Sequence, residues 1–151
     1  MINLTIARME REHIESIAAL ERQCFSTPWT EENLLEKLDM DTAYFFVALD
    51  DDRVIGYIGV NVIADSCFID NIAVEPSCRR QGVGRALLKM AVLTADVMGT
   101  EFISLEVRES NYAAIALYRS LGFEQMGMRR DFYRNPRENA WIMTKIFSKK
   151  D

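Results

Sequence analysis

The stretch that most constrains the fold runs from Ile72 to Arg85 and reads IAVEPSCRRQGVGR. Its apolar start predicts the end of a strand, Pro76 predicts a turn, and the glycine-rich part predicts a loop that opens a helix. After the loop, apolar residues recur at helical spacing as far as Met98, and Gly99 follows where a helix commonly ends. The sequence therefore predicts a strand, a glycine loop and a helix in direct succession.

The glycine loop is suited to bind a pyrophosphate. The first turn of a helix has backbone N–H groups without internal partners, and the helix dipole adds partial positive charge there. Gly82 and Gly84 leave these groups uncovered, and formal positive charge comes from the neighbouring Arg79, Arg80 and Arg85. The loop lacks the Gly-Lys-Ser/Thr of a Walker A motif and the third glycine of a dinucleotide fingerprint. The alternative is an ordinary strand-to-helix connection with glycines for tight packing.

The remainder of the chain alternates predicted strands and helices, without a repeat, a linker or a low-complexity tract. Before the loop we expect a strand at 2–6, helices at 10–24 and 30–38, and strands at 44–49, 54–63 and 67–74. After the loop and its helix we expect a strand at 102–107, a helix at 112–121, and strands at 123–128 and 140–147 joined by an irregular segment. This order predicts a single α/β domain over residues 1–151, with a mixed, twisted sheet flanked by helices.

The composition excludes several classes of protein. With 49% hydrophobic and 27% charged residues, the chain is neither disordered nor collagen-like. No apolar run approaches the ~20 residues of a membrane span, and we expect no signal peptide. A net charge of -5 argues against general binding to nucleic acid and is compatible with attraction of a basic peptide. Three cysteines without metal-ligand spacing and a single histidine indicate reduced thiols in the cytoplasm and no metal site.

Glu106 is the first candidate for chemistry, because it lies in an otherwise apolar predicted strand. Partial burial of its carboxylate would raise its pKa and make it a better general base near neutral pH. Alternatively, the side chain lies on the opposite face of the strand with Ser104 and Arg108. In that case an ion pair with Arg108 is the simplest interpretation, and both arrangements stay open from the residues alone.

Tyr118 follows on the predicted helix at 112–121, on the face that packs against the sheet. Its ring can belong to the core, while its hydroxyl, directed at the mouth of the loop, could protonate a leaving thiolate. Asn111, at the start of the same helix, either caps the helix or contacts a bound cofactor. Phe25 and Trp29 flank the break between the first two helices, where they form either a hydrophobic staple or a loop that faces the substrate.

Several of these segments resemble one protein family. Residues 79–84 fit R/Q-x-x-G-x-G/A, the acyl-CoA pyrophosphate loop of the Gcn5-related N-acetyltransferases (GNAT). LEVRESN at 105–111, with LY at 117–118 and LGF at 121–123, is similar to the GNAT branch of ribosomal-protein-alanine N-acetyltransferases, the RimI family. The resemblance extends along nearly the whole chain, with further matches at 24–25, 28–29, 71–74, 129–130, 132–133 and 140–143.

The resemblance implies direct transfer of an acetyl group from acetyl-CoA to an amine, without a metal. It makes Glu106 the general base and Tyr118 the general acid. The family commonly has Tyr-Tyr where this chain has Phe132-Tyr133, so one hydroxyl available for peptide binding is missing. The implied cofactor contacts are Ile72, Ala73, Val74, Arg80, Gln81, Gly82, Val83, Gly84, Arg85 and Asn111, and the implied substrate contacts are Phe25, Trp29, Phe132 and Tyr133.

The acceptor implied by the resemblance is the N-terminal α-amine of a ribosomal small-subunit protein that begins with alanine. Since an α-amino group has a pKa of ~8, against ~10.4 for lysine, a carboxylate base favours the α-amine mildly. The alternatives are acetylation of a lysine or a small polyamine, and a non-catalytic acyl-CoA-binding module. Retention of both Glu106 and Tyr118 argues against the non-catalytic module. We expect a cytoplasmic monomer that contacts neither nucleic acid nor a membrane.

Overall fold

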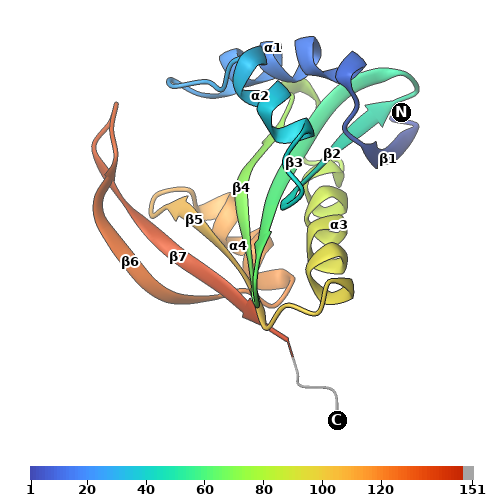
Figure 1. Cartoon of the computed structure of the whole chain (residues 1–151). Helices are drawn as coiled ribbons and strands as arrows, with labels where there is room; N and C mark the ends of the chain where they lie inside the picture. The colour runs from blue at the N-terminus through green and yellow to red at the C-terminus, as the bar shows by residue number, and fades with distance from the viewer. Residues whose placement is uncertain (148–151) are drawn as a thin grey trace.

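A seven-stranded sheet organises the computed structural model, which describes residues 1–147 (Figure 1). The α/β class, with a mixed sheet and flanking helices, is confirmed. The strands are β1 (Leu4–Arg8), β2 (Ala43–Asp50), β3 (Arg53–Ile63), β4 (Ser66–Val74), β5 (Phe102–Arg108), β6 (Glu124–Tyr133) and β7 (Glu138–Ile146). The helices are α1 (Ile14–Cys24), α2 (Glu31–Leu38), α3 (Val83–Val97) and α4 (Tyr112–Ser120), with short 3-10 turns η1 (Arg11–His13) and η2 (Pro76–Cys78).

The sheet splits between its two central strands. Its strand order is β1-β2-β3-β4-β5-β7-β6, and β4–β5 is its parallel pair. These two strands pair only at their starts, from Ser66 opposite Phe102 to Phe68 opposite Ser104. Beyond this point β5, β7 and β6 diverge from β4, as Figure 1 shows. The carboxyl-terminal halves of β4 and β5 therefore do not pair with each other.

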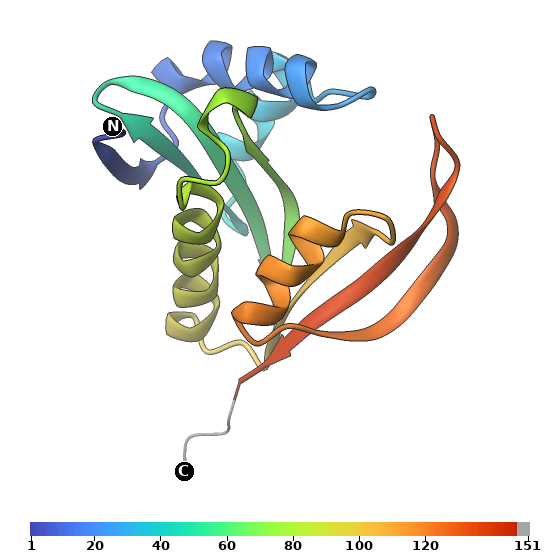
Figure 2. The ribbon, with the colours of Figure 1, turned by 180° about the vertical axis from the view of Figure 1, so that it is seen from behind.

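Helices cover both faces of the sheet and bury two separate cores. On one face α1 and α2 pack against β2 and β3, with Ile17 and Leu34 fully buried beside Tyr57. On the other face α3 and α4 pack against the sheet, with Leu87 buried beside Ile103 (Figure 2). No helix within residues 1–147 is long and apolar enough to cross a membrane.

The helix boundaries largely follow the sequence signals. Thr30 is the N-cap of α2, where its side chain accepts a hydrogen bond from the Asn33 backbone N–H at 3.1 Å. Gly99 follows α3 with a φ of +76°, a left-handed conformation that glycine adopts without a Cβ penalty. These two positions show that local capping chemistry fixes where the helices begin and end.

The sequence prediction was wrong near the carboxyl-terminal end. β6 continues to Tyr133 instead of stopping near Met128, and β7 already begins at Glu138. The two strands therefore form a long hairpin with a short turn at 134–137, where an irregular segment was expected. The physical reason is that β6 is an edge strand with most of its residues exposed, so it lacks the apolar alternation that marks a half-buried strand.

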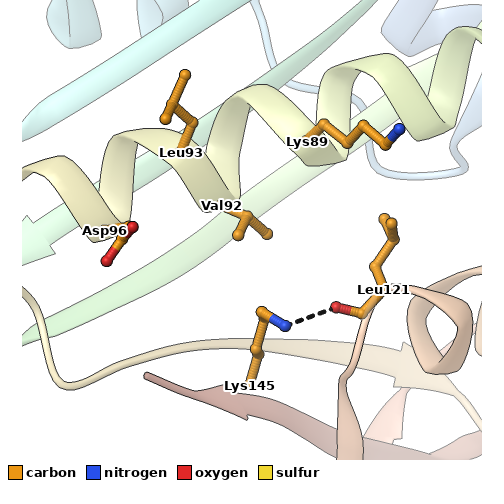
Figure 3. Close-up of a pocket in the computed structure, with 6 residues that line it drawn as sticks. All are labelled: Lys89, Val92, Leu93, Asp96, Leu121 and Lys145. Atoms are coloured by element: carbon orange, nitrogen blue, oxygen red, sulfur yellow. Dashed lines mark hydrogen bonds between the residues drawn. The ribbon is translucent and has the colours of Figure 1, made fainter. Parts of the chain in front are cut away.

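Lys145 on β7 holds the carboxyl-terminal end of α4. Its Nζ donates a hydrogen bond to the Leu121 carbonyl oxygen at 2.9 Å, next to Gly122. Figure 3 shows this contact at a pocket on the α3 side of the sheet. The pocket is lined by Lys89, Val92, Leu93, Asp96, Leu121 and Lys145.

We expect Lys145→Met to lower the free energy of unfolding by about 1–2 kcal/mol, because a charged donor at a helix carboxyl terminus is lost. Denaturation in urea, followed by circular dichroism, measures this change. Lys89→Met is the matched control, since Lys89 lines the same pocket but its side chain makes no hydrogen bond or ion pair with the described residues. Equal losses in the two variants would show that the contact with Leu121 does not stabilise the fold.

Candidate active site

The split in the sheet leaves backbone groups of β4 without a strand partner. The Glu75 N–H donates to the Ile55 carbonyl oxygen at 2.8 Å, which fixes the hydrogen-bonded positions of the antiparallel β3–β4 ladder. Because such positions alternate, the backbone of Ala73 also faces β3, whereas Ile72 and Val74 direct their N–H and C=O groups toward the split. Of the three predicted β4 contacts, Ile72 and Val74 therefore direct backbone groups away from β3, and Ala73 does not. Asn71 Oδ1 accepts the Ile72 N–H at 3.1 Å, and Arg79 Nε donates to the Val74 carbonyl oxygen at 3.1 Å.

The loop before α3 presents an open set of donors. Gly82 is the N-cap of α3, with a φ of +85°, and a Cβ at this position would meet no atom within 4 Å. The first helical hydrogen bond runs from the Ala86 N–H to the Gly82 carbonyl at 3.0 Å. The preceding N–H groups, those of Val83, Gly84 and Arg85, thus have no helical acceptor. This arrangement can bind an anion, because the helix dipole favours negative charge at the same place.

The basic side chains around this loop differ in their surroundings. Arg80 is exposed, with a φ of +65°, and Arg85 is exposed beside the loop while its guanidinium donates to Ser120 Oγ at 3.0 Å. Gln81 bonds the Ser77 carbonyl at 3.4 Å. Arg79 instead turns back to β4, which leaves Arg80 and Arg85 as the positive charges beside the helix start.

Glu106 lies on the face of β5 opposite its buried neighbours Leu105 and Val107, with 34% of its side chain exposed. Its carboxylate pairs with Arg129 on β6, at 3.2 Å from Nε. The alternative of an ion pair between Glu106 and Arg108 is wrong, because Arg108 pairs with Glu138 on β7 at 3.2 Å. The long hairpin brings Arg129 within reach of Glu106, and the sequence prediction had not extended β6 this far. The carboxylate is thus partly exposed at the split.

Tyr118 is nearly buried, 6% exposed, with its ring 6.0 Å from that of Phe123. Its hydroxyl makes no hydrogen bond to residues 1–147, yet no fully buried side-chain oxygen among them lacks a partner, so the hydroxyl reaches solvent. Burial, with a smaller contribution from Tyr133, raises the pKa of Tyr118 to about 12. The phenol therefore remains protonated near neutral pH.

Tyr133 interacts electrostatically with both Tyr118 and Glu106. Burial and the negative charge of Glu106 raise the pKa of Tyr133 to about 12. Its ring lies 4.4 Å from the guanidinium carbon of Arg108 and 5.1 Å from the ring of Phe132. Phe132 itself remains 45% exposed on the hairpin. Residues from β5, α4 and β6 thus gather on the β5 side of the split.

The remaining predicted residues have clear structural contacts. Asn111 caps α4, since its Oδ1 accepts the Ala114 N–H at 3.3 Å. Phe25 and Trp29 are half-buried and pack on the core beneath α1 and α2, as a staple would. The Trp29 ring lies 5.8 Å from the ring of Phe45. These contacts account for the positions of the three side chains.

Sequence reasoning missed Glu21, which is fully buried in α1. Its Oε1 accepts the Trp29 N–H at 2.8 Å, and its Oε2 accepts the Tyr57 hydroxyl at 2.7 Å and the Asn71 Nδ2 at 2.8 Å. Burial raises the pKa of Glu21, whereas the Trp29 and Tyr57 hydrogen bonds lower it. A signal was present, because Glu21 follows the buried Ile17 by four residues and so lies on the buried helix face.

Comparisons with known proteins give one consistent result. The sequence model described as "Acetyltransferase (GNAT) family" matches residues 14–123. The [ribosomal protein bS18]-alanine N-acetyltransferase of Escherichia coli K12 is 34% identical over 142 residues, which cover 92% of this chain and 95% of that protein. The N-alpha-acetyltransferase RimI of Mycobacterium tuberculosis is 31% identical over 146 residues, which cover 93% and 90%. The crystal structure of the Escherichia coli ribosomal-protein-S18-alanine N-acetyltransferase has a TM-score of 0.89 at 33% identity, covering 98% of this chain and 96% of that one.

Proposed function

Because this chain belongs to the acetyltransferase (GNAT) family, we propose that it transfers an acetyl group from acetyl-CoA to the N-terminal α-amine of a ribosomal small-subunit protein. The observation that carries this proposal is the split between β4 and β5, with Glu106 on one side and, on the other, backbone groups of β4 that pair with no strand. Since the Escherichia coli relative is named for the alanine of bS18, the proposed acceptor is an alanine-initiated bS18 protein.

Acetyl-CoA has two suitable contact regions in this proposal. Its pyrophosphate binds the uncovered N–H groups of Val83, Gly84 and Arg85, with the charges of Arg80 and Arg85 and the loop residues Gln81 and Gly82 around it. Its pantetheine arm lies along the split, beside Ile72 and Val74 and within reach of Asn111 at the start of α4. Both regions favour an extended ligand with a charged end and amide groups.

The proposed reaction is direct attack of the amine on the thioester carbonyl. Glu106 accepts the proton that the amine loses, and the Val74 N–H polarises the carbonyl oxygen as negative charge develops on it. The C–N bond forms, the C–S bond breaks, and the electron pair leaves with the CoA sulfur. Tyr118 donates a hydrogen bond to that sulfur. Because the pKa of Tyr118 is about 12, against ~8.5 for a typical thiol, solvent completes the protonation of the thiolate.

The acceptor peptide in this proposal enters between the α1–α2 loop and the β6–β7 hairpin. Phe25 and Trp29 contact it from the loop, and Phe132 and Tyr133 contact it from the hairpin. The exposed Phe132 offers an apolar surface, while Tyr133 supplies the one hydroxyl of this pair. Together they would place the N-terminal amine near Glu106.

We expect acetyl transfer to a short alanine-initiated peptide with a free N-terminus, measured by mass spectrometry as one added acetyl group. The matched control is the same peptide with a blocked N-terminus and an added lysine. A free α-amine with its pKa of ~8 is deprotonated more readily than a lysine amine at ~10.4, so the blocked control should stay unmodified. Acetylation of the control would identify a lysine acetyltransferase, and binding of acetyl-CoA without any transfer would identify a non-catalytic module.

A further inference from the structure

A second pair of opposite charges lies beside the split, on the β4 side. The Lys37 Nζ is 3.8 Å from Asp70 Oδ2, and the two side chains are 21% and 22% exposed. The same Oδ2 accepts a hydrogen bond from Asn61 Nδ2 at 2.5 Å. Burial raises the pKa of Asp70, whereas Lys37 and Asn61 lower it. Both charges are thus mostly withdrawn from water but keep some contact with it, and the proposed reaction uses neither of them.

The strand register places Asp70 at the same level as Glu106. β4 and β5 pair last at Phe68 and Ser104, and Asp70 and Glu106 each follow two residues later on their strands. Glu106 lies on the face of β5 that is turned away from the core beneath α3 and α4. Asp70 lies on that same face of the sheet, because its partner Lys37 is on α2. The two carboxylates therefore flank the split, one from each strand.

Lys37 also connects this pair with the α1–α2 loop. Its Nζ lies 5.4 Å from the centre of the Trp29 ring, and Trp29 is one of the proposed acceptor contacts. A peptide that passes Trp29 and places its amine at Glu106 brings its first side chain toward Asp70 and Lys37. The pair therefore lies where one N-terminal residue can be distinguished from another.

We propose that Asp70 and Lys37 determine specificity for the first residue of the acceptor, admitting a small side chain and rejecting a large apolar one. A large apolar side chain removes the remaining water from both charges and offers no hydrogen bond in return, which costs free energy. A methyl group is small enough to leave that water in place. Specificity commonly arises in this way, from groups that a competitor would desolvate. This inference rests on the proposed acetylation of an N-terminal amine, and it assigns the choice of first residue to side chains outside the reacting groups.

Three peptides that differ only in their first residue test the proposal on the wild-type protein. The first residue is alanine, asparagine or leucine, and mass spectrometry of acetylated product gives kcat/KM for each. Alanine should be preferred over leucine by at least about tenfold, the cost of desolvating a partly buried ion pair. Asparagine has nearly the size of leucine but can hydrogen-bond to either charge, so its kcat/KM should lie between the other two. Equal rejection of asparagine and leucine would show exclusion by size alone and would overturn the inference.

The double variant Asp70→Leu with Lys37→Met removes both charges and leaves neither partner unpaired. The first side chain then meets an apolar surface, so kcat/KM for the leucine peptide should rise by at least about tenfold over the wild-type value. Damage to the fold cannot produce this result, because it lowers activity on all three peptides by the same factor. The gain on the leucine peptide thus separates specificity from a structural contribution.

Glu36→Leu with Lys89→Met is the matched control. It removes the same two charges at exposed positions of α2 and α3, whose side chains make no hydrogen bond or ion pair with the described residues. The control should keep the wild-type order of the three peptides. An equal gain on leucine in this control, or none in the Asp70 and Lys37 double variant, would overturn the inference while transfer to the alanine peptide upholds the proposed function. Acetylation of none of the peptides by the wild-type protein would refute the proposed function and this inference with it.

Discussion

Replacing Glu106 with glutamine is expected to lower kcat by a factor of about 10²–10⁴, the usual contribution of a general base. Glutamine keeps the size of the side chain but cannot accept the proton that the amine loses during attack. The affinity for acetyl-CoA should not change, because its proposed contacts are on β4 and on the loop before α3, whereas Glu106 is on β5. Steady-state kinetics with the alanine-initiated peptide and calorimetric titration of acetyl-CoA measure the two quantities separately.

Arg129→Gln is the control for the Glu106 variant, because each substitution breaks the same ion pair from opposite sides. If the pair only supports the fold, the two variants should lose similar activity. If Glu106 is the base, Arg129→Gln should retain most of kcat, since the carboxylate is still present. Both partners are partly exposed, so loss of this surface ion pair should cost no more than about 1 kcal/mol of stability. Unchanged turnover in Glu106→Gln would reject the base assignment.

The sequence predicted the elements around the split well because their signals are local. Alternating apolar residues mark β2 to β5, and Thr30, Gly82 and Gly99 mark helix ends through chemistry that involves only a few neighbouring residues. The strand–loop–helix succession also follows from local pattern, which is why the order of elements could be derived before any tertiary contact was known.

The contacts of the candidate site could not be derived in the same way. Arg129 contacts Glu106 from β6, which lies next to β7 at the edge of the sheet. Sequence proximity favoured Arg108 instead, which pairs with Glu138. The hydrogen bonds between Glu21 and Asn71 join residues fifty positions apart. Periodicity can place a side chain on a face of a helix or strand, but it does not identify its partner across the sheet.

Tyr118→Phe is expected to lower kcat by about 10²-fold, the loss reported for removing one donor that stabilises developing charge. Phenylalanine keeps the ring that packs near Phe123, and the hydroxyl has no hydrogen-bond partner among the described residues. Stability and acetyl-CoA affinity should therefore stay close to their wild-type values. The decrease should appear in kcat, because the hydrogen bond to the sulfur strengthens only as the thiolate forms.

The pH dependence separates this function of Tyr118 from that of a titrating acid. Burial raises the pKa of Tyr118 to about 12, so the phenol stays protonated and its ionisation begins to lower kcat only as pH approaches that value. A wild-type profile of kcat that declines near pH 10, and loses that decline in Tyr118→Phe, would contradict the raised pKa. If Tyr118→Phe keeps full activity, the hydroxyl does not contact the leaving sulfur, and solvent alone then protonates the thiolate while the tyrosine ring serves only the core.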